Sequence, residues 1–235
     1  MRRAAGRGRE PLLAGDPGGG GGRLRPEPGA DFPLPFPCSG RTLGGVADPF
    51  AFRELRIRQP GKVLPGRARY EIFDPGKKLL AVAAETESRG VLRTMMGLVP
   101  GTRVLAVRTP SGEPILTLVR QDSENNWLAA LTDEDGRLIG KIRIEFSRRH
   151  YTLLDDQGEV VGQAAGDLGA TQFSVTGAEG ERYAQIRKTW AGLGKELLTS
   201  SDHYTVTFTG PVSASIRTMI VMVPIVLDMT RHGPY

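Results

Sequence analysis

The chain is poor in the residues that most often bind metals or form cross-links, with one cysteine and three histidines. Because Cys38 has no second cysteine to pair with, no internal disulfide is possible, and a reducing cytoplasmic setting is the simplest expectation. His150, His203 and His232 lie far apart and lack the spacing of metal ligands. We therefore predict no zinc site.

The common catalytic motifs are also missing. There is no nucleophile elbow, Walker loop or dinucleotide fingerprint, because the glycine-rich runs lie in the first fifty residues or close short turns. Acidic pairs such as Asp133–Glu134 and Asp155–Asp156 stand in turn segments, where solvated turn residues are more common than paired catalytic carboxylates. We do not expect an enzyme.

The sequence lacks a comfortable membrane span. No apolar stretch beyond Leu12–Ala14 follows the first arginines, so no secretory signal is evident. Arg217 and Asp228 enclose ten uncharged residues. These make about 15 Å of helix, whereas a bilayer core of about 30 Å needs roughly twenty residues. Because the segment is apolar on every side, we predict a buried core helix over residues 213–230, capped at Ser213, with a transmembrane helix as the alternative.

Positive charge is confined to the first part of the chain. Residues 1–66 hold eleven Arg or Lys against six Asp or Glu, a net of +5, and residues 67–235 hold twenty against twenty. The neutral remainder argues against a phosphate-tracking surface, so no nucleic-acid partner is expected. Attraction to an anionic membrane would fall on Arg2, Arg3, Arg7, Arg9 and the cluster of Arg53, Arg56, Arg58 and Lys62. A solvated charged tail is the alternative.

Composition divides the chain near residue 51. Residues 1–50 contain twelve glycines and eight prolines, too few apolar groups to offset the entropy of ordering. We predict a disordered tail over residues 1–51 and one domain over residues 52–235. In the domain, short alternating runs separated by turn signals predict strands at 52–59, 67–73, 77–86, 103–108, 114–120, 127–131, 138–146, 150–154, 160–165, 171–176, 182–186 and 204–208.

Twelve antiparallel strands in one open sheet would leave costly edges, so we expect the sheet to close on itself. A barrel of that size is too wide for its own side chains to fill. The apolar C-terminal segment supplies the missing core. The predicted fold is mostly β: a closed twelve-stranded antiparallel β-barrel enclosing a hydrophobic C-terminal α-helix.

One segment carries a family-like signature, Lys188-x-Trp190-x-Gly192-x-x-x-Glu196-x-x-Thr199-x-x-Asp202-x-Tyr204. It resembles the phospholipid scramblase family and, more loosely, the LURP-one-related proteins and the tubby C-terminal barrel. The likeness extends over roughly residues 52–230. It implies a twelve-stranded barrel around a C-terminal helix, association with membranes, and movement of phospholipids between leaflets, often dependent on calcium. It also implies a protein partner for the proline-rich part of the tail, residues 26–37.

The sequence departs from that family in the calcium-binding loop. The counterpart of the loop is Ser200 to Pro211, whose first, third and last residues are Ser200, Asp202 and Pro211. One carboxylate remains where calcium requires several oxygen ligands and a terminal bidentate acid. We expect no cofactor and no tight calcium binding, and we interpret Asp202 as a turn or strand-start residue.

Two functions from different classes follow. The first is a scramblase-like protein on the inner face of the plasma membrane, which binds anionic phospholipid through the basic cluster and through Lys188 and Trp190. The second is a soluble cytoplasmic barrel that binds proteins and moves no lipid. In that case Trp190 packs at the barrel rim, Gly192 permits a tight turn and Glu196 pairs locally.

Overall fold

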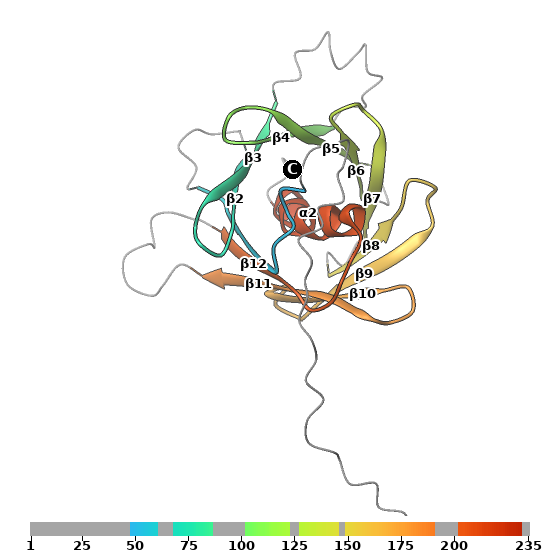
Figure 1. The fold of residues 1–235 in the computed structure, drawn as a ribbon. Helices are drawn as coiled ribbons and strands as arrows, with labels where there is room; N and C mark the ends of the chain where they lie inside the picture. The colour runs from blue at the N-terminus through green and yellow to red at the C-terminus, as the bar shows by residue number, and fades with distance from the viewer. Residues whose placement is uncertain are drawn as a thin grey trace, which may run out of the picture. The chain divides into compact units, whose positions relative to one another are not determined.

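The computed structural model describes residues 48–60, 68–86, 102–122, 127–145, 149–190 and 202–231. In this part of the chain, twelve antiparallel strands close into a barrel around one helix (Figure 1), which confirms the predicted fold. The elements are β1 (Glu54–Arg58), β2 (Arg69–Phe73), β3 (Leu79–Glu85), β4 (Arg103–Arg108), β5 (Pro114–Asp122), β6 (Trp127–Asp133), β7 (Leu138–Ile144), β8 (His150–Leu154), β9 (Val160–Gly166), β10 (Gln172–Gly177), β11 (Arg182–Trp190), β12 (Asp202–Phe208) and α2 (Ala214–Arg231).

The barrel is a simple meander. Each strand pairs with the next along the chain, and β1 closes the ring by pairing with β12 from Glu54↔Thr207 to Arg58↔His203. This closure satisfies the backbone groups that a twelve-stranded open sheet would leave at its edges. Each predicted strand overlaps an observed one, and β11 runs four residues beyond its predicted end, to Trp190.

Alternation along the strands separates the core from the surface. In β7, Ile142 and Ile144 are almost completely buried, whereas Arg143 between them is exposed. Small residues on the inner face leave room for the helix. Five alanines there are fully buried: Ala81, Ala83, Ala129, Ala164 and Ala184.

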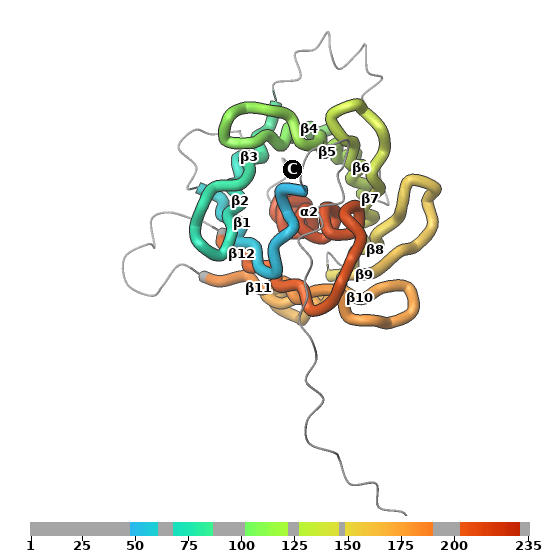
Figure 2. The backbone as a smooth tube through the Cα atoms, in the orientation of Figure 1, coloured from blue at the N-terminus to red at the C-terminus, as the bar shows by residue number. Residues whose placement is uncertain are grey.

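Helix α2 lies inside the ring of strands, as the tube view shows (Figure 2). Ser213 caps its start, because the Ile216 amide donates to Oγ at 3.3 Å and the Arg217 amide to the Ser213 carbonyl at 2.9 Å. The apolar residues between Met219 and Met229 are fully buried, which confirms the predicted core helix. Within the described residues, no helix has both the length and the apolar character needed to cross a bilayer.

The two ends of the barrel differ. We call the end where α2 begins the entry end and the end where α2 finishes the exit end. The entry end carries the turns that join β2 to β3, β4 to β5, β6 to β7, β8 to β9 and β10 to β11. Glycines with φ of 81° to 96° close four of these five turns. A left-handed backbone of this kind favours glycine. Of the connections at the exit end, the turn between β9 and β10 is described throughout.

The domain begins earlier than expected. Residues 48–51, assigned from the sequence to the tail, lie against the entry end, where the Phe50 side chain is fully buried. Asp48 holds this segment in place, because its Oδ1 accepts a hydrogen bond from the Phe50 amide at 2.8 Å. The rest of the predicted tail, residues 1–47, lies outside the described residues.

Candidate functional site

The three described arginines of the predicted basic cluster differ in position and in partners. Arg53 lies exposed before β1, at the entry end. Arg56 and Arg58 point outward from β1 and pair with carboxylates, Arg56 with Glu54 at 3.0 Å and Arg58 with Glu71 at 2.5 Å. Both guanidinium-bearing side chains remain nearly half exposed, at 45% and 48%. Lys62 lies outside the described residues.

The signature residues gather at the exit end. Lys188 lies opposite Tyr204 and Trp190 opposite Asp202, so the register of β11 and β12 brings these four positions together. The Lys188 ammonium lies 5.6 Å from the centre of the Tyr204 ring, and Tyr204 is buried, so Lys188 faces inward. Gly192, Glu196 and Thr199 lie outside the described residues.

The outer face of β10, β11 and β12 is chemically distinctive. Cross-strand register aligns Arg56, Thr205, Arg187 and Gln172 in one row that crosses four strands. Of the described side chains that point outward from these three strands, none is a carboxylate. They are Gln172, Ser174, Thr176, Tyr183, Gln185, Arg187, Thr189, His203, Thr205 and Thr207. We call this surface the β10–β12 face, and its hydroxyl, amide and guanidinium groups suit an anionic partner.

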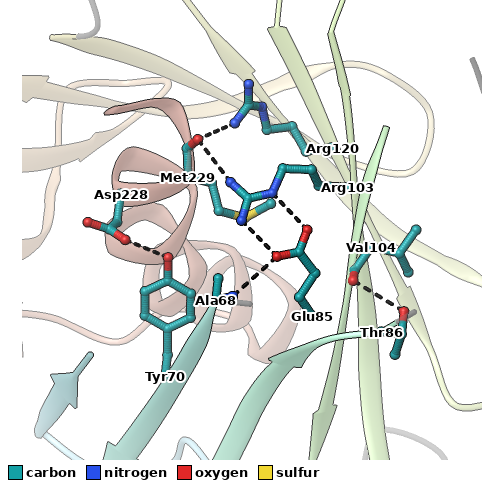
Figure 3. A network of polar contacts seen from close by, with 9 residues as sticks. All are labelled: Ala68, Tyr70, Glu85, Thr86, Arg103, Val104, Arg120, Asp228 and Met229. Carbon is teal, nitrogen blue, oxygen red and sulfur yellow. Dashed lines mark hydrogen bonds and ion pairs between the residues drawn. The ribbon is translucent and has the colours of Figure 1, made fainter. Parts of the chain in front are cut away.

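A polar cluster inside the exit end was not foreseen from the sequence (Figure 3). We call Tyr70, Glu85, Arg103, Arg120 and Asp228 the exit-end cluster. The Tyr70 hydroxyl donates to Asp228 Oδ2 at 2.6 Å, and Arg103 donates to both oxygens of Glu85 at 2.9 Å. Arg103 and Arg120 also donate to the Met229 carbonyl near the end of α2.

Electrostatics explain why charged groups are stable in this cluster. Burial, reinforced by the Asp228 carboxylate, raises the pKa of Tyr70 well above its usual value. Burial also opposes ionisation of Glu85, but hydrogen bonds from Arg103 and the Ala68 amide outweigh it and lower the pKa of this carboxyl. Cations near a helix C-terminus are favourable, so the two arginines also stabilise the end of α2. The cluster therefore stabilises the position of the C-terminal end of α2 in the barrel.

The structure does not fit the calcium loop that the family resemblance implies. Residues 202–208 of its counterpart form β12, which pairs with β1 on one side and β11 on the other. A twelve-residue calcium loop instead wraps around the ion and presents backbone and side-chain oxygens to it. Asp202 stands at the start of this strand. In the described part of the chain, no group of three or more His, Cys, Asp or Glu residues is placed to hold a metal ion.

A hollow of about 400 Å³ lies on the outer face of β2, β3 and β4. Ala84 and Ala106 are too small to fill it, and Arg69 and Arg108 are among the residues that line it. Both arginines already have partners: Arg69 lies 3.5 Å from Glu71, and Arg108 donates to the Gly112 carbonyl at 3.0 Å. The hollow is therefore a weaker anion site than the β10–β12 face.

Comparisons with known proteins bear on the resemblance that the signature indicates. The Scramblase family model matches residues 66–232. No curated protein matches the chain. The crystal structure of a protein from Arabidopsis thaliana is similar at 16% identity and a TM-score of 0.41, over 73% of this chain and 91% of that chain. Because the family match covers well over half of its length, the chain belongs to the Scramblase family.

Proposed function

We propose that this protein binds the surface of anionic phospholipid membranes on their cytoplasmic side, and that it acts by binding and not by catalysis. Membership of the Scramblase family is the observation that carries the proposal. The confinement of net positive charge to residues 1–66 supports it, since basic segments are attracted to anionic lipid.

Lipid contact is assigned to the outside of the barrel. The apolar residues of α2 from Met219 to Met229 are fully buried, so the described part of the barrel interior is filled by its own helix. On the outside, Arg56, Arg58 and Arg187 lie on β1 and β11, the two strands that flank β12. We propose these three residues, together with the arginines of residues 1–47, as the headgroup contacts.

A flotation assay tests this proposal. The full chain should float with phosphatidylcholine vesicles that contain phosphatidylserine, and less with phosphatidylcholine alone. A chain that starts at Asp48 keeps all twelve strands, so it separates the contribution of the tail from damage to the barrel. A full chain that stays unbound on phosphatidylserine vesicles would refute the proposal.

Substitution of three arginines tests the assigned surface. Arg56→Gln/Arg58→Gln/Arg187→Gln should weaken binding on the order of a hundredfold, since each cation near an anionic surface contributes about 1 kcal/mol. The matched control is Arg137→Gln, in the hairpin between β6 and β7, whose side chain is 75% exposed. An equal loss of binding free energy per removed charge in the variant and the control would point to net charge alone and remove the surface assignment.

Movement of phospholipid between leaflets is the finer activity that we propose from the family. Because α2 occupies the described interior, we propose that any such path runs along the outside of the barrel. The alternative is a protein-interaction scaffold that moves no lipid, and the strand in place of the calcium loop favours it. Leaflet exchange in proteoliposomes, measured with and without calcium, separates the two. Exchange stimulated by calcium would contradict the expected loss of the calcium site.

A further inference from the structure

The turn between β9 and β10 is fixed by its own polar groups. The Ala170 amide donates to the Asp167 carbonyl at 2.9 Å, and Asp167 Oδ1 accepts the Thr171 amide at 2.7 Å. The Thr171 hydroxyl donates to Asp167 Oδ2 at 2.7 Å. Ala170 has a left-handed φ of 48° and is 6% exposed, so it anchors the turn to the core. The turn therefore holds its tip in a defined position.

The tip of this turn is Leu168, whose side chain is 91% exposed. Hairpins at the entry end have the same hydrogen bond from the fourth residue to the first, with Glu134, Asp156 and Pro110 at the position that corresponds to Leu168. A single exposed leucine is ordinary on a protein surface. A leucine displayed by a rigid turn, where the other turns display polar or small residues, calls for a functional explanation.

The surroundings of Leu168 are cationic and continuous with the β10–β12 face. The Lys188 amide donates to the Thr171 carbonyl at 2.6 Å, and the Gly166 amide donates to the Arg149 carbonyl at 2.7 Å. Arg187 lies opposite Gln172, the first residue of β10. Arg149 precedes β8 and Arg187 points outward from β11, so two cationic residues flank the turn, whereas Lys188 faces inward. Among the nearby carboxylates, Asp167 bonds within the turn and Glu145 lies 3.6 Å from His150.

We propose that Leu168 inserts into the boundary between headgroups and acyl chains of an anionic phospholipid bilayer, with the exit end of the barrel facing the membrane. An apolar tip with basic neighbours matches that boundary, where the tip leaves water and the cations meet lipid phosphates. The inference rests on the proposed membrane binding and adds the residue that enters the bilayer. It places Arg187 and the end of β11 at Trp190 on the membrane side.

The test compares the two large apolar side chains that are exposed in the described part of the chain. Val160, 43% exposed, begins β9 at the entry end, so Val160→Ser is a matched control for Leu168→Ser. On full-length protein and phosphatidylcholine–phosphatidylserine vesicles, we expect Leu168→Ser to bind about tenfold more weakly, because a partly buried leucine no longer leaves water. Val160→Ser should bind like the unmodified chain, and both variants should melt at its temperature.

A direct readout separates insertion from weaker binding. A polarity-sensitive fluorophore is attached to Leu168→Cys or to Val160→Cys, each in a Cys38→Ser background. Emission at position 168 should shift to the blue on vesicles, and emission at position 160 should not. If the chain floats but the fluorophore at 168 still reports water, the inference fails and the proposed function stands.

Two other outcomes also overturn the inference. A blue shift at position 168 that grows with protein concentration in the absence of vesicles would assign the turn to self-association. If the unmodified chain does not float at all, insertion and the proposed function fail together.

Discussion

At the scale of single residues, Gly140 shows how closely the helix packs against the barrel wall. A Cβ atom at this position in β7 would lie 2.6 Å from the Leu154 carbonyl oxygen and 2.6 Å from Met219 Sδ on α2. Methionine could shift, but the backbone carbonyl cannot do so without disturbing β8. We expect Gly140→Ala to lower the free energy of unfolding by about 1–3 kcal/mol, the usual cost of overpacking, as measured by urea denaturation.

The control for Gly140 is Gly210→Ala. Its Cβ would lie 3.5 Å from the Arg182 carbonyl oxygen, an ordinary van der Waals contact. This variant should unfold at nearly the same urea concentration as the unmodified chain. If both glycine variants were equally stable, the close approach of α2 to β7 would be wrong.

Ionisation of Tyr70 makes the stability of the fold depend on pH in the alkaline range. Its folded pKa lies well above 10.0, so its contribution to stability is present below pH 10 and is lost as the pH rises towards the folded value. We expect unfolding midpoints of the unmodified chain to fall steeply above pH 10. The unfolding midpoint of Tyr70→Phe should fall less steeply with pH. At neutral pH this variant should lose about 1–3 kcal/mol of unfolding free energy, because Asp228 loses a buried hydrogen-bond donor.

Tyr183 serves as the comparison for Tyr70. A hydrogen bond to Glu181 raises the pKa of Tyr183 to about 12, but this tyrosine is only partly buried, on the outer face of β11. Tyr183→Phe should therefore change stability little at neutral pH. An equal loss in the two variants would show that burial of Tyr70 against Asp228 has no special effect.

At the scale of elements, α2 is held at its last turn by the exit-end cluster. Arg103 bridges Glu85 and the Met229 carbonyl, so its removal affects both a half-buried ion pair and the end of the helix. We expect Arg103→Met to lower the free energy of unfolding by about 2–4 kcal/mol. This is somewhat less than the loss expected at a fully buried ion pair, because the side chains of Arg103 and Glu85 are 16% and 19% exposed.

A double-mutant cycle tests the origin of that cost. The double variant Arg103→Met/Glu85→Met should lose less free energy of unfolding than the two single variants lose together, because no charge then remains without its partner. The exposed pair Arg56–Glu54 gives the reference, and its Arg56→Met variant should lose less than about 1 kcal/mol. Strict additivity at Arg103 and Glu85 would contradict the described coupling.

Hydrophobic alternation was sufficient to predict the strands, because each inner face repeats every second residue and each turn carries a glycine or an acidic residue. The same reasoning missed the exit-end cluster. A charged side chain at the end of a strand is ordinarily assigned to solvent, yet Glu85, Arg103 and Arg120 continue the inward face of their strands. Their pairing depends on strand register and on the length of α2, which no local pattern contains.

The site was less predictable than the fold for a related reason. Arg187 stands three residues before Trp190 in the sequence, but its alignment with Arg56 arises from pairing across β12. No sequence pattern indicates that Glu54 and Glu71 pair with arginines of the predicted basic cluster. Leu168 stood in a short polar segment between two strands, and its exposure follows only from the turn geometry.

At the scale of the whole domain, closure depends on a segment that precedes the family match. The match begins at residue 66, whereas β1 and the segment around Phe50 come before it. That segment also binds the start of α2, because Arg217 donates to the Phe52 carbonyl at 3.1 Å and lies 3.9 Å from Asp48. The family-matched region is therefore shorter than the folding unit.

Truncation tests this dependence. A chain that begins at Asp48 should unfold cooperatively at the temperature of the full chain. A chain that begins at residue 66 loses the buried side chains of Phe50, Leu55 and Ile57. Their burial contributes roughly 5–9 kcal/mol, comparable with the total stability of a typical domain. Removal of β1 also exposes the edges of β2 and β12, so we expect the short chain to aggregate and to lose the cooperative unfolding transition.

Addition of a peptide spanning residues 48–60 should restore the transition, because β1 can pair again with β12 and β2. A peptide with Ile57→Glu should not, since residue 57 faces the core and a buried carboxylate there would lack a partner. Calorimetry of the short chain with each peptide distinguishes these cases. A short chain that melts like the full protein without any peptide would mean that β1 is dispensable and that the barrel tolerates an open seam.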